Sequence, residues 1–78
     1  MAQVNFSKTK VLNKSKYVLQ EEVESTYSVF ERDGKEYFQI ETYGRNSRKL
    51  KGKPSQILQL DKKSAEELIK ILKTFIEL

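Results

Sequence analysis

Residues 32–35 read "RDGK", and this tetrapeptide decides the architecture of the first half of the chain. Asp and Gly tolerate the positive φ values that a two-residue type I′ turn requires. The flanking residues 17–31 and 36–43 alternate apolar and polar side chains, which is typical of strands with one buried face. The sequence therefore predicts a hairpin with Asp33 and Gly34 at its tip, and the upstream segment is either one long bent strand or two short ones.

The turn also predicts which residues face each other across the hairpin. Val29 would lie opposite Phe38 on a face rich in apolar side chains, so we expect that face to form the core. The same register places Glu31 opposite Glu36, a repulsion of roughly a few tenths of a kcal/mol unless a basic residue of the turn offsets it.

The opposite face of the hairpin carries aromatic residues among polar ones, namely Phe30, Tyr37 and Tyr43. Aromatic rings beside positive charge can stack on unpaired bases, and each stacked base contributes about 1–3 kcal/mol to the binding free energy. The alternative is that these rings pack against the N-terminal arm or a second subunit, and the residues alone favour neither reading.

The C-terminal part of the chain predicts one more strand and a helix. Residues 55–60, "SQILQL", are a short apolar strand, and residues 61–78 form an amphipathic helix. Ser64 and Glu67 have the spacing of a capping box, with Asp61 as the alternative cap. The apolar stripe of this helix consists of Ala65, Leu68, Ile69, Leu72, Phe75 and Ile76.

Together these elements predict an α+β fold, an antiparallel sheet of about four strands followed by one C-terminal helix. Residues 1–16 are basic and polar, and we expect a loosely ordered N-terminal arm with a short strand near Val11. Residues 17–78 would form a single α+β domain.

Composition argues against enzymatic activity. The 78 residues contain neither Cys nor His, which excludes disulfides, thiolate ligands and the commonest general base. We therefore expect no catalytic residues, no metal ligands and no cofactor. No apolar run is long enough to span a membrane and no secretory signal is recognisable, so the expected location is the cytoplasm.

A chain of this size buries only about 60% of its unfolded surface, so its core is thin. Ile71 and Leu78 lie off the apolar stripe of the helix and could contact another subunit. The alternative is that they flank the same core. The expectation is a homodimer.

The charge is segregated along the chain. Residues 1–16 hold four Lys and no acid, and residues 17–43 sum to −5, from six Glu and one Asp against one Arg and one Lys. Residues 44–54, "GRNSRKLKGKP", carry +5 and are longer than a usual hairpin loop. Arginine forks and lysines bind phosphate, so this basic loop is either a nucleic-acid contact or a solvated connection. Its basic residues are Arg45, Arg48, Lys49, Lys51 and Lys53.

The segments "KEYFQIETYG" and "KGKPSQILQLDKKSAEELIKIL", within residues 35–72, carry a family resemblance. The chain resembles the positive-cofactor-four type of transcriptional coactivators and their bacterial relatives, in the superfamily of the Whirly proteins. The resemblance implies a curved antiparallel sheet followed by one helix, dimerisation through the helices, and single-stranded DNA bound across the sheets. This chain has Glu41 where the family usually has Arg.

The functional hypothesis is a small nucleic-acid-binding protein that favours single-stranded DNA. The basic loop would contact phosphates, and the three aromatic residues would stack on bases. The alternative is a protein-interaction module, such as a phage or mobile-element inhibitor that docks on a partner protein, which the acidic residues 17–31 favour.

Overall fold

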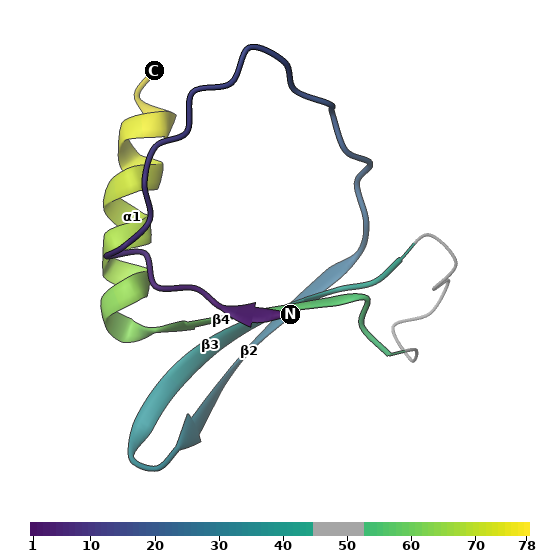
Figure 1. Cartoon of the computed structure of the whole chain (residues 1–78). Helices are drawn as coiled ribbons and strands as arrows, with labels where there is room; N and C mark the ends of the chain where they lie inside the picture. Colours follow the sequence, from purple (N-terminus) through teal and green to yellow (C-terminus); the bar gives the residue numbers. More distant parts are fainter. Residues whose placement is uncertain (45–52) are drawn as a thin grey trace.

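The computed structural model describes residues 1–44 and 53–78, and it shows a four-stranded sheet followed by one helix (Figure 1). The elements are β1 (Ala2–Gln3), β2 (Ser25–Arg32), β3 (Lys35–Thr42), β4 (Gln56–Asp61) and α1 (Lys62–Ile76). The order across the sheet is β1-β4-β3-β2. The predicted α+β fold is confirmed, although the sheet is mixed because β1 pairs with β4 in parallel.

The hairpin of β2 and β3 has the predicted turn and register. Asp33 and Gly34 adopt φ values of 56° and 80°, the left-handed region that this turn needs. Val29 pairs with Phe38, and every other pair of the ladder follows from the same turn. A Cβ on Gly34 would meet nothing within 4 Å, so its φ and not a lack of space makes glycine suitable there.

The repulsion between Glu31 and Glu36 is offset by a residue outside the hairpin. These residues face each other as predicted, but the compensating cation comes from the helix and not from the turn. Lys62 Nζ lies 2.8 Å from Glu36 Oε1. This hydrogen bond, and then the charge of Lys62, lower the pKa of the Glu36 carboxyl and raise the pKa of the Lys62 ammonium.

Strand alternation gives the sheet two chemically different faces. The face on the side of α1, which we call the helix-side face, carries Tyr27, Val29, Phe38, Ile40, Leu58 and Leu60. The other, which we call the polar face, carries Thr26, Ser28, Phe30, Arg32, Tyr37, Gln39, Glu41, Ile57 and Gln59. In antiparallel pairs, directly opposed residues project to the same side, so each face is continuous across the three long strands.

The start of α1 joins the helix, β4 and the N-terminal arm. Asp61 is the N-cap, and its Oδ1 accepts a hydrogen bond of 2.8 Å from the Ser64 amide. Ser64 is buried, and its Oγ accepts a 3.0 Å bond from the Phe6 amide. Of the two predicted caps, Asp61 is therefore the one used, because the helix begins at Lys62 and places Ser64 inside its first turn.

The segment before β2 differs from the prediction. The strand begins at Ser25, and residues 17–24 are exposed and outside the sheet. One long strand over residues 17–31 is therefore wrong, and of the two short strands predicted as the alternative only the second, which starts at Ser25, is present. A single backbone bond, from the Tyr43 amide to the Glu24 carbonyl at 3.0 Å, continues the ladder beyond it. Upstream residues would have to pair with the start of the basic loop, whose polar sequence offers no alternating apolar partner.

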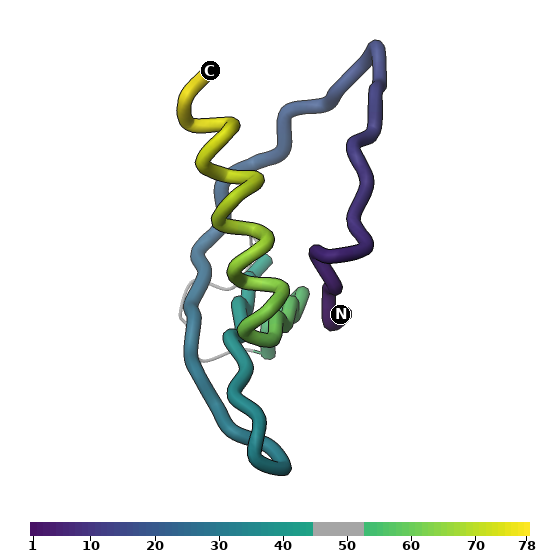
Figure 2. The backbone as a smooth tube through the Cα atoms, turned by 90° about the vertical axis from the view of Figure 1, so that its left-hand side faces the viewer, coloured from purple at the N-terminus to yellow at the C-terminus, as the bar shows by residue number. Residues whose placement is uncertain are grey.

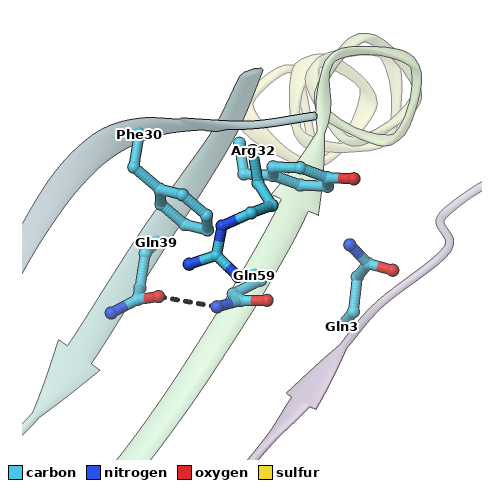
Figure 3. Close-up of a pocket in the computed structure, with 6 residues that line it drawn as sticks. Gln3, Phe30, Arg32, Gln39 and Gln59 are labelled. Carbon is cyan, nitrogen blue, oxygen red and sulfur yellow. Dashed lines mark hydrogen bonds between the residues drawn. The ribbon is translucent and has the colours of Figure 1, made fainter. Parts of the chain in front are cut away.

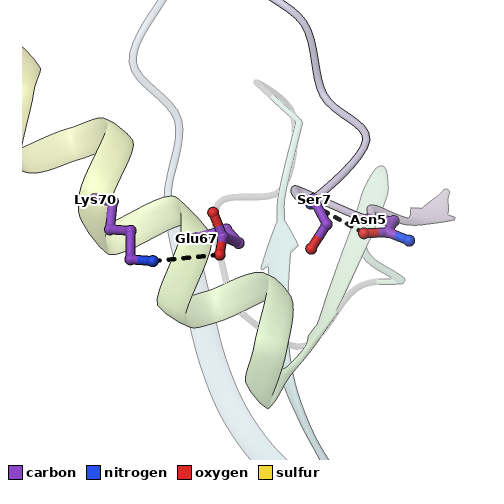
Figure 4. Close-up of polar contacts among 4 residues, drawn as sticks. All are labelled: Asn5, Ser7, Glu67 and Lys70. Carbon is purple, nitrogen blue, oxygen red and sulfur yellow. Dashed lines mark hydrogen bonds and ion pairs between the residues drawn. The ribbon is translucent and has the colours of Figure 1, made fainter.

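The N-terminal strand also lies elsewhere than expected. It is formed by Ala2–Gln3, and not by residues near Val11, which is 92% exposed. Residues 9–24 describe a wide arc, which overlaps α1 in Figure 1 but lies apart from it in Figure 2. Local polar contacts shape the arm and the helix separately (Figure 4). The Ser7 amide donates to Asn5 Oδ1 at 3.0 Å, and Lys70 pairs with Glu67 at 3.5 Å.

The apolar core is small within one chain. Among the described residues, only Tyr43 and Leu60 are buried hydrophobic side chains. Helix α1 contacts β3 and β4 near its start, and its C-terminal end lies away from the sheet (Figures 1 and 2). The apolar stripe of the helix is consequently exposed beyond its second turn, with Ile69 at 64% and Phe75 at 66%.

Candidate nucleic-acid interface

A pocket of about 400 Å³ opens on the polar face of the sheet (Figure 3). It is lined by Gln3, Phe30, Arg32, Tyr37, Gln39 and Gln59. These residues come from all four strands, so the pocket exists only because the hairpin, β4 and β1 are assembled into one sheet. Its wall combines aromatic rings, amides and one guanidinium, the groups that bind nucleobases and phosphates.

The aromatic wall is the cross-strand pair of Phe30 and Tyr37. Their ring centroids lie 5.3 Å apart with an interplanar angle of 23°, and both side chains are half-buried. The structure thus brings together two of the three aromatic residues singled out from the sequence. A similar stack of Tyr27 on Phe38, at 5.4 Å, lies on the helix-side face and serves as an internal comparison.

Arg32 was not identified from the sequence as a site residue. It is the last residue of β2, and Figure 3 shows its guanidinium pointing toward Gln39 and Gln59 of the pocket. Within residues 1–44 and 53–78 it forms no ion pair. The signal that could have found it is the register itself, because Arg32 follows Phe30 by two positions and so lies on the same face.

A chain of hydrogen bonds crosses the polar face beside the pocket. Gln59 Nε2 donates to Gln39 Oε1 at 2.7 Å, and Gln39 Nε2 donates to Glu41 Oε1 at 3.3 Å. From the other side, Thr26 Oγ1 donates to Glu41 Oε2 at 3.4 Å. The amides that line the pocket are therefore held in place and do not rotate freely.

Tyr43 occupies a different environment from the other two aromatic residues. It is only 6% exposed, and its hydroxyl lies 3.1 Å from Thr26 Oγ1. Its ring is therefore part of the packed sheet in this structure, and it offers no free face for stacking.

The basic loop leaves the sheet next to Tyr43. Thr42 and Ser55 close its base, with a 2.7 Å bond from the Ser55 amide to the Thr42 carbonyl. Lys53 is exposed. The other predicted phosphate contacts, Arg45, Arg48, Lys49 and Lys51, lie outside the described residues.

The part of the chain that the structure describes holds neither a cluster of metal ligands nor a helix that could span a membrane. No group of three or more acidic, His or Cys side chains there could hold a metal ion. Among the same residues, no helix combines the length and the apolar character needed to cross a membrane.

The comparisons with known proteins gave no relative. No protein-family model matches the chain, and neither the curated proteins nor the solved structures contain a match.

Proposed function

We propose that this protein binds single-stranded nucleic acid, preferably DNA, across the polar face of the sheet and the adjacent basic loop. The observation that carries the proposal is the pocket in which the stacked pair of Phe30 and Tyr37 lies beside the guanidinium of Arg32. An aromatic surface next to a cation can hold an unpaired base and its phosphate at the same time.

Unpaired strands fit this surface better than a duplex does. Single-stranded bases can be splayed out onto a sheet and stacked on its rings, whereas the faces of duplex bases are covered by their neighbours. From Tyr37 to Tyr43 the polar face extends about 20 Å along β3, at roughly 3.3 Å per residue. A bound strand could therefore reach from the aromatic pocket to the base of the basic loop.

Stacking and charge make separable contributions, which a fluorescence titration with labelled oligonucleotides at two salt concentrations can measure. Tyr37→Ala should weaken binding to a single strand without changing the salt dependence, because stacking releases no counterions. Tyr27→Ala removes a comparable stacked ring from the opposite face and is the matched control, at a concentration where sedimentation shows the same oligomeric state as wild type. Equal binding by wild type and Tyr37→Ala would refute the pocket as the binding site.

The basic loop is tested in the same assay. Neutralising one phosphate contact, as in Lys49→Ala or Lys51→Ala, should flatten the slope of log K against log salt by about 0.7 for a single strand. Removal of the four lysines of residues 1–16 controls for non-specific charge. Binding that survives neutralisation of all five basic loop residues would show that the loop is only a solvated connection.

We also propose that the functional unit is a homodimer. One chain exposes 7462 Å², whereas a folded monomer of 9.2 kDa exposes about 4,900 Å². Its radius of gyration is 14.6 Å, against about 11.5 Å for a compact chain of this length. The excess is larger than the roughly 800 Å² that each partner buries in a standard interface, and the extended arm contributes to it.

The protein-interaction module remains the second candidate, and the exposed helix-side face favours it. Tyr27 and Val29 are 74% and 62% exposed there, which is unusual for a face of this apolar composition. Sedimentation equilibrium of the purified chain distinguishes the two candidates for what covers this face, a second copy of the chain and a partner protein. A dimer assigns the face to a second copy, while a stable monomer that binds no oligonucleotide supports a partner protein.

A further inference from the structure

The hydrogen-bond chain on the polar face has a fixed direction, and the direction is set by Glu41. An ionised carboxylate can only accept hydrogen bonds. Gln39 must therefore turn its Nε2 toward Glu41 Oε1, at 3.3 Å, which leaves its Oε1 for the Nε2 of Gln59, at 2.7 Å. Thr26 likewise donates to the same carboxylate, at 3.4 Å.

This direction has its consequence in the pocket, at the end of the hydrogen-bond chain that is farthest from Glu41. Because Gln59 uses its Nε2 toward Gln39, its Oε1 points away from Gln39, toward the side on which Gln3 lies (Figure 3). The pocket therefore presents a carbonyl acceptor at this position. A donor could take its place only if the direction of every hydrogen bond in the series were reversed.

Arg32 supplies the complementary group. Its guanidinium carries five N–H donors and no acceptor, and it points toward the glutamines of the same pocket. A base stacked on the pair of Phe30 and Tyr37 would thus meet a fork of donors and one acceptor. The position of Glu41 adds a second constraint, because its negative charge repels a phosphate and leaves this part of the face to base edges.

We propose that the pocket selects cytosine over thymine or uracil, an inference that rests on the proposed binding of single strands. Cytosine offers two adjacent acceptors, O2 and N3, to the fork of Arg32, and its N4 amino group can donate to Gln59 Oε1. Thymine and uracil present an N3–H donor and a carbonyl at the corresponding positions, so donor meets donor and acceptor meets acceptor. Adenine, with an amino group and one ring acceptor, ranks between them.

In this arrangement Glu41 is a positioning residue that acts through Gln39 and Gln59. Its replacement by an amide removes the constraint, because Gln at this position can donate as well as accept. The direction of the hydrogen-bond chain is then no longer imposed, and both orientations of the Gln59 amide become available to a bound base.

The test is a competition between short oligonucleotides of C, T and A, at mildly alkaline pH so that cytosine stays neutral. Wild type should prefer the C oligonucleotide to the T oligonucleotide by roughly tenfold or more. Glu41→Gln should bring the ratio close to one while retaining binding of the T oligonucleotide. Glu31→Gln removes the same charge from the other face and should leave the ratio unchanged.

The outcomes separate this proposal from the one on which it rests. Equal binding of all three oligonucleotides by wild type would overturn the selectivity and keep the proposed function. A cytosine preference that persists in Glu41→Gln would overturn the role of Glu41 in setting the pocket. Binding of no oligonucleotide would overturn the proposed function and the selectivity with it.

Discussion

Replacement of Ser64 by alanine tests how the N-terminal arm is attached to the domain. Ser64 is 2% exposed, and its Oγ accepts the 3.0 Å hydrogen bond from the Phe6 amide. Its own amide is held by Asp61 and is unaffected by the substitution. Ser64→Ala therefore removes one acceptor and otherwise preserves the shape and the cap of the helix.

The expected cost follows from two opposing effects. An N–H left without an acceptor in a partly buried position costs about 1–3 kcal/mol. Alanine is the better helix former, which returns about 0.5 kcal/mol at an interior position. Ser64→Ala should therefore lower the free energy of unfolding by about 1–2 kcal/mol and should release the first residues of the chain from β4.

Urea unfolding at a fixed chain concentration measures the stability, since association would otherwise shift the midpoint. Hydrogen exchange of the Phe6 amide reports the attachment of the arm directly. Thr74→Ala is the matched control, because it removes an exposed hydroxyl from the same helix and should be neutral or slightly stabilising. A Ser64→Ala variant as stable as wild type, with the Phe6 amide still protected, would refute the reasoning.

Three further predictions concern the turn, the ion pair and the exposed helix. Gly34→Ala should destabilise the protein by about 1–2 kcal/mol in urea unfolding because φ there is 80°, and an unchanged midpoint would contradict that turn geometry. Lys62→Ala should raise the pKa of Glu36 toward its ordinary range in an NMR titration; the wild-type pair stabilises at neutral pH and stops doing so as pH falls through the lowered pKa. Phe75→Asp, at a 66% exposed position, should shift sedimentation from dimer to monomer, and an unaltered dimer would place the interface elsewhere.

The sequence was sufficient for the elements whose signals are local. The Asp-Gly turn specifies the hairpin and its register because only residues tolerant of positive φ fit there, and the amphipathic pattern after Asp61 specifies the helix. The upstream alternation around Tyr17 and Leu19 was misleading, since alternation alone does not make a strand, and residues 17–24 lie outside the sheet.

Non-local contacts account for what could not be predicted. Two contacts join segments that are far apart in the sequence: Ala2 pairs with Leu58, and Phe6 bonds to Ser64. The sequence pattern of neither segment predicts its contact with the other. The residues of the candidate site likewise fall into those that local signals predict and those that depend on contacts between distant segments. Phe30 and Tyr37 follow from the hairpin register, whereas the contribution of Gln59 to the pocket depends on where β4 lies.

The parallel pairing of β1 with β4 has a consequence for the order in which the molecule folds. The hairpin closes a loop of two residues, while Ala2 can meet Leu58 only after more than fifty intervening residues have been brought together. Loop-closure entropy makes that long closure about 3 kcal/mol more costly than the hairpin before any contact compensates it. We therefore expect the hairpin to form early and β1 to dock last, after β4 and the helix are in place. On a ribosome, β1 would be synthesised before the other three strands of this sheet and would join the sheet after them.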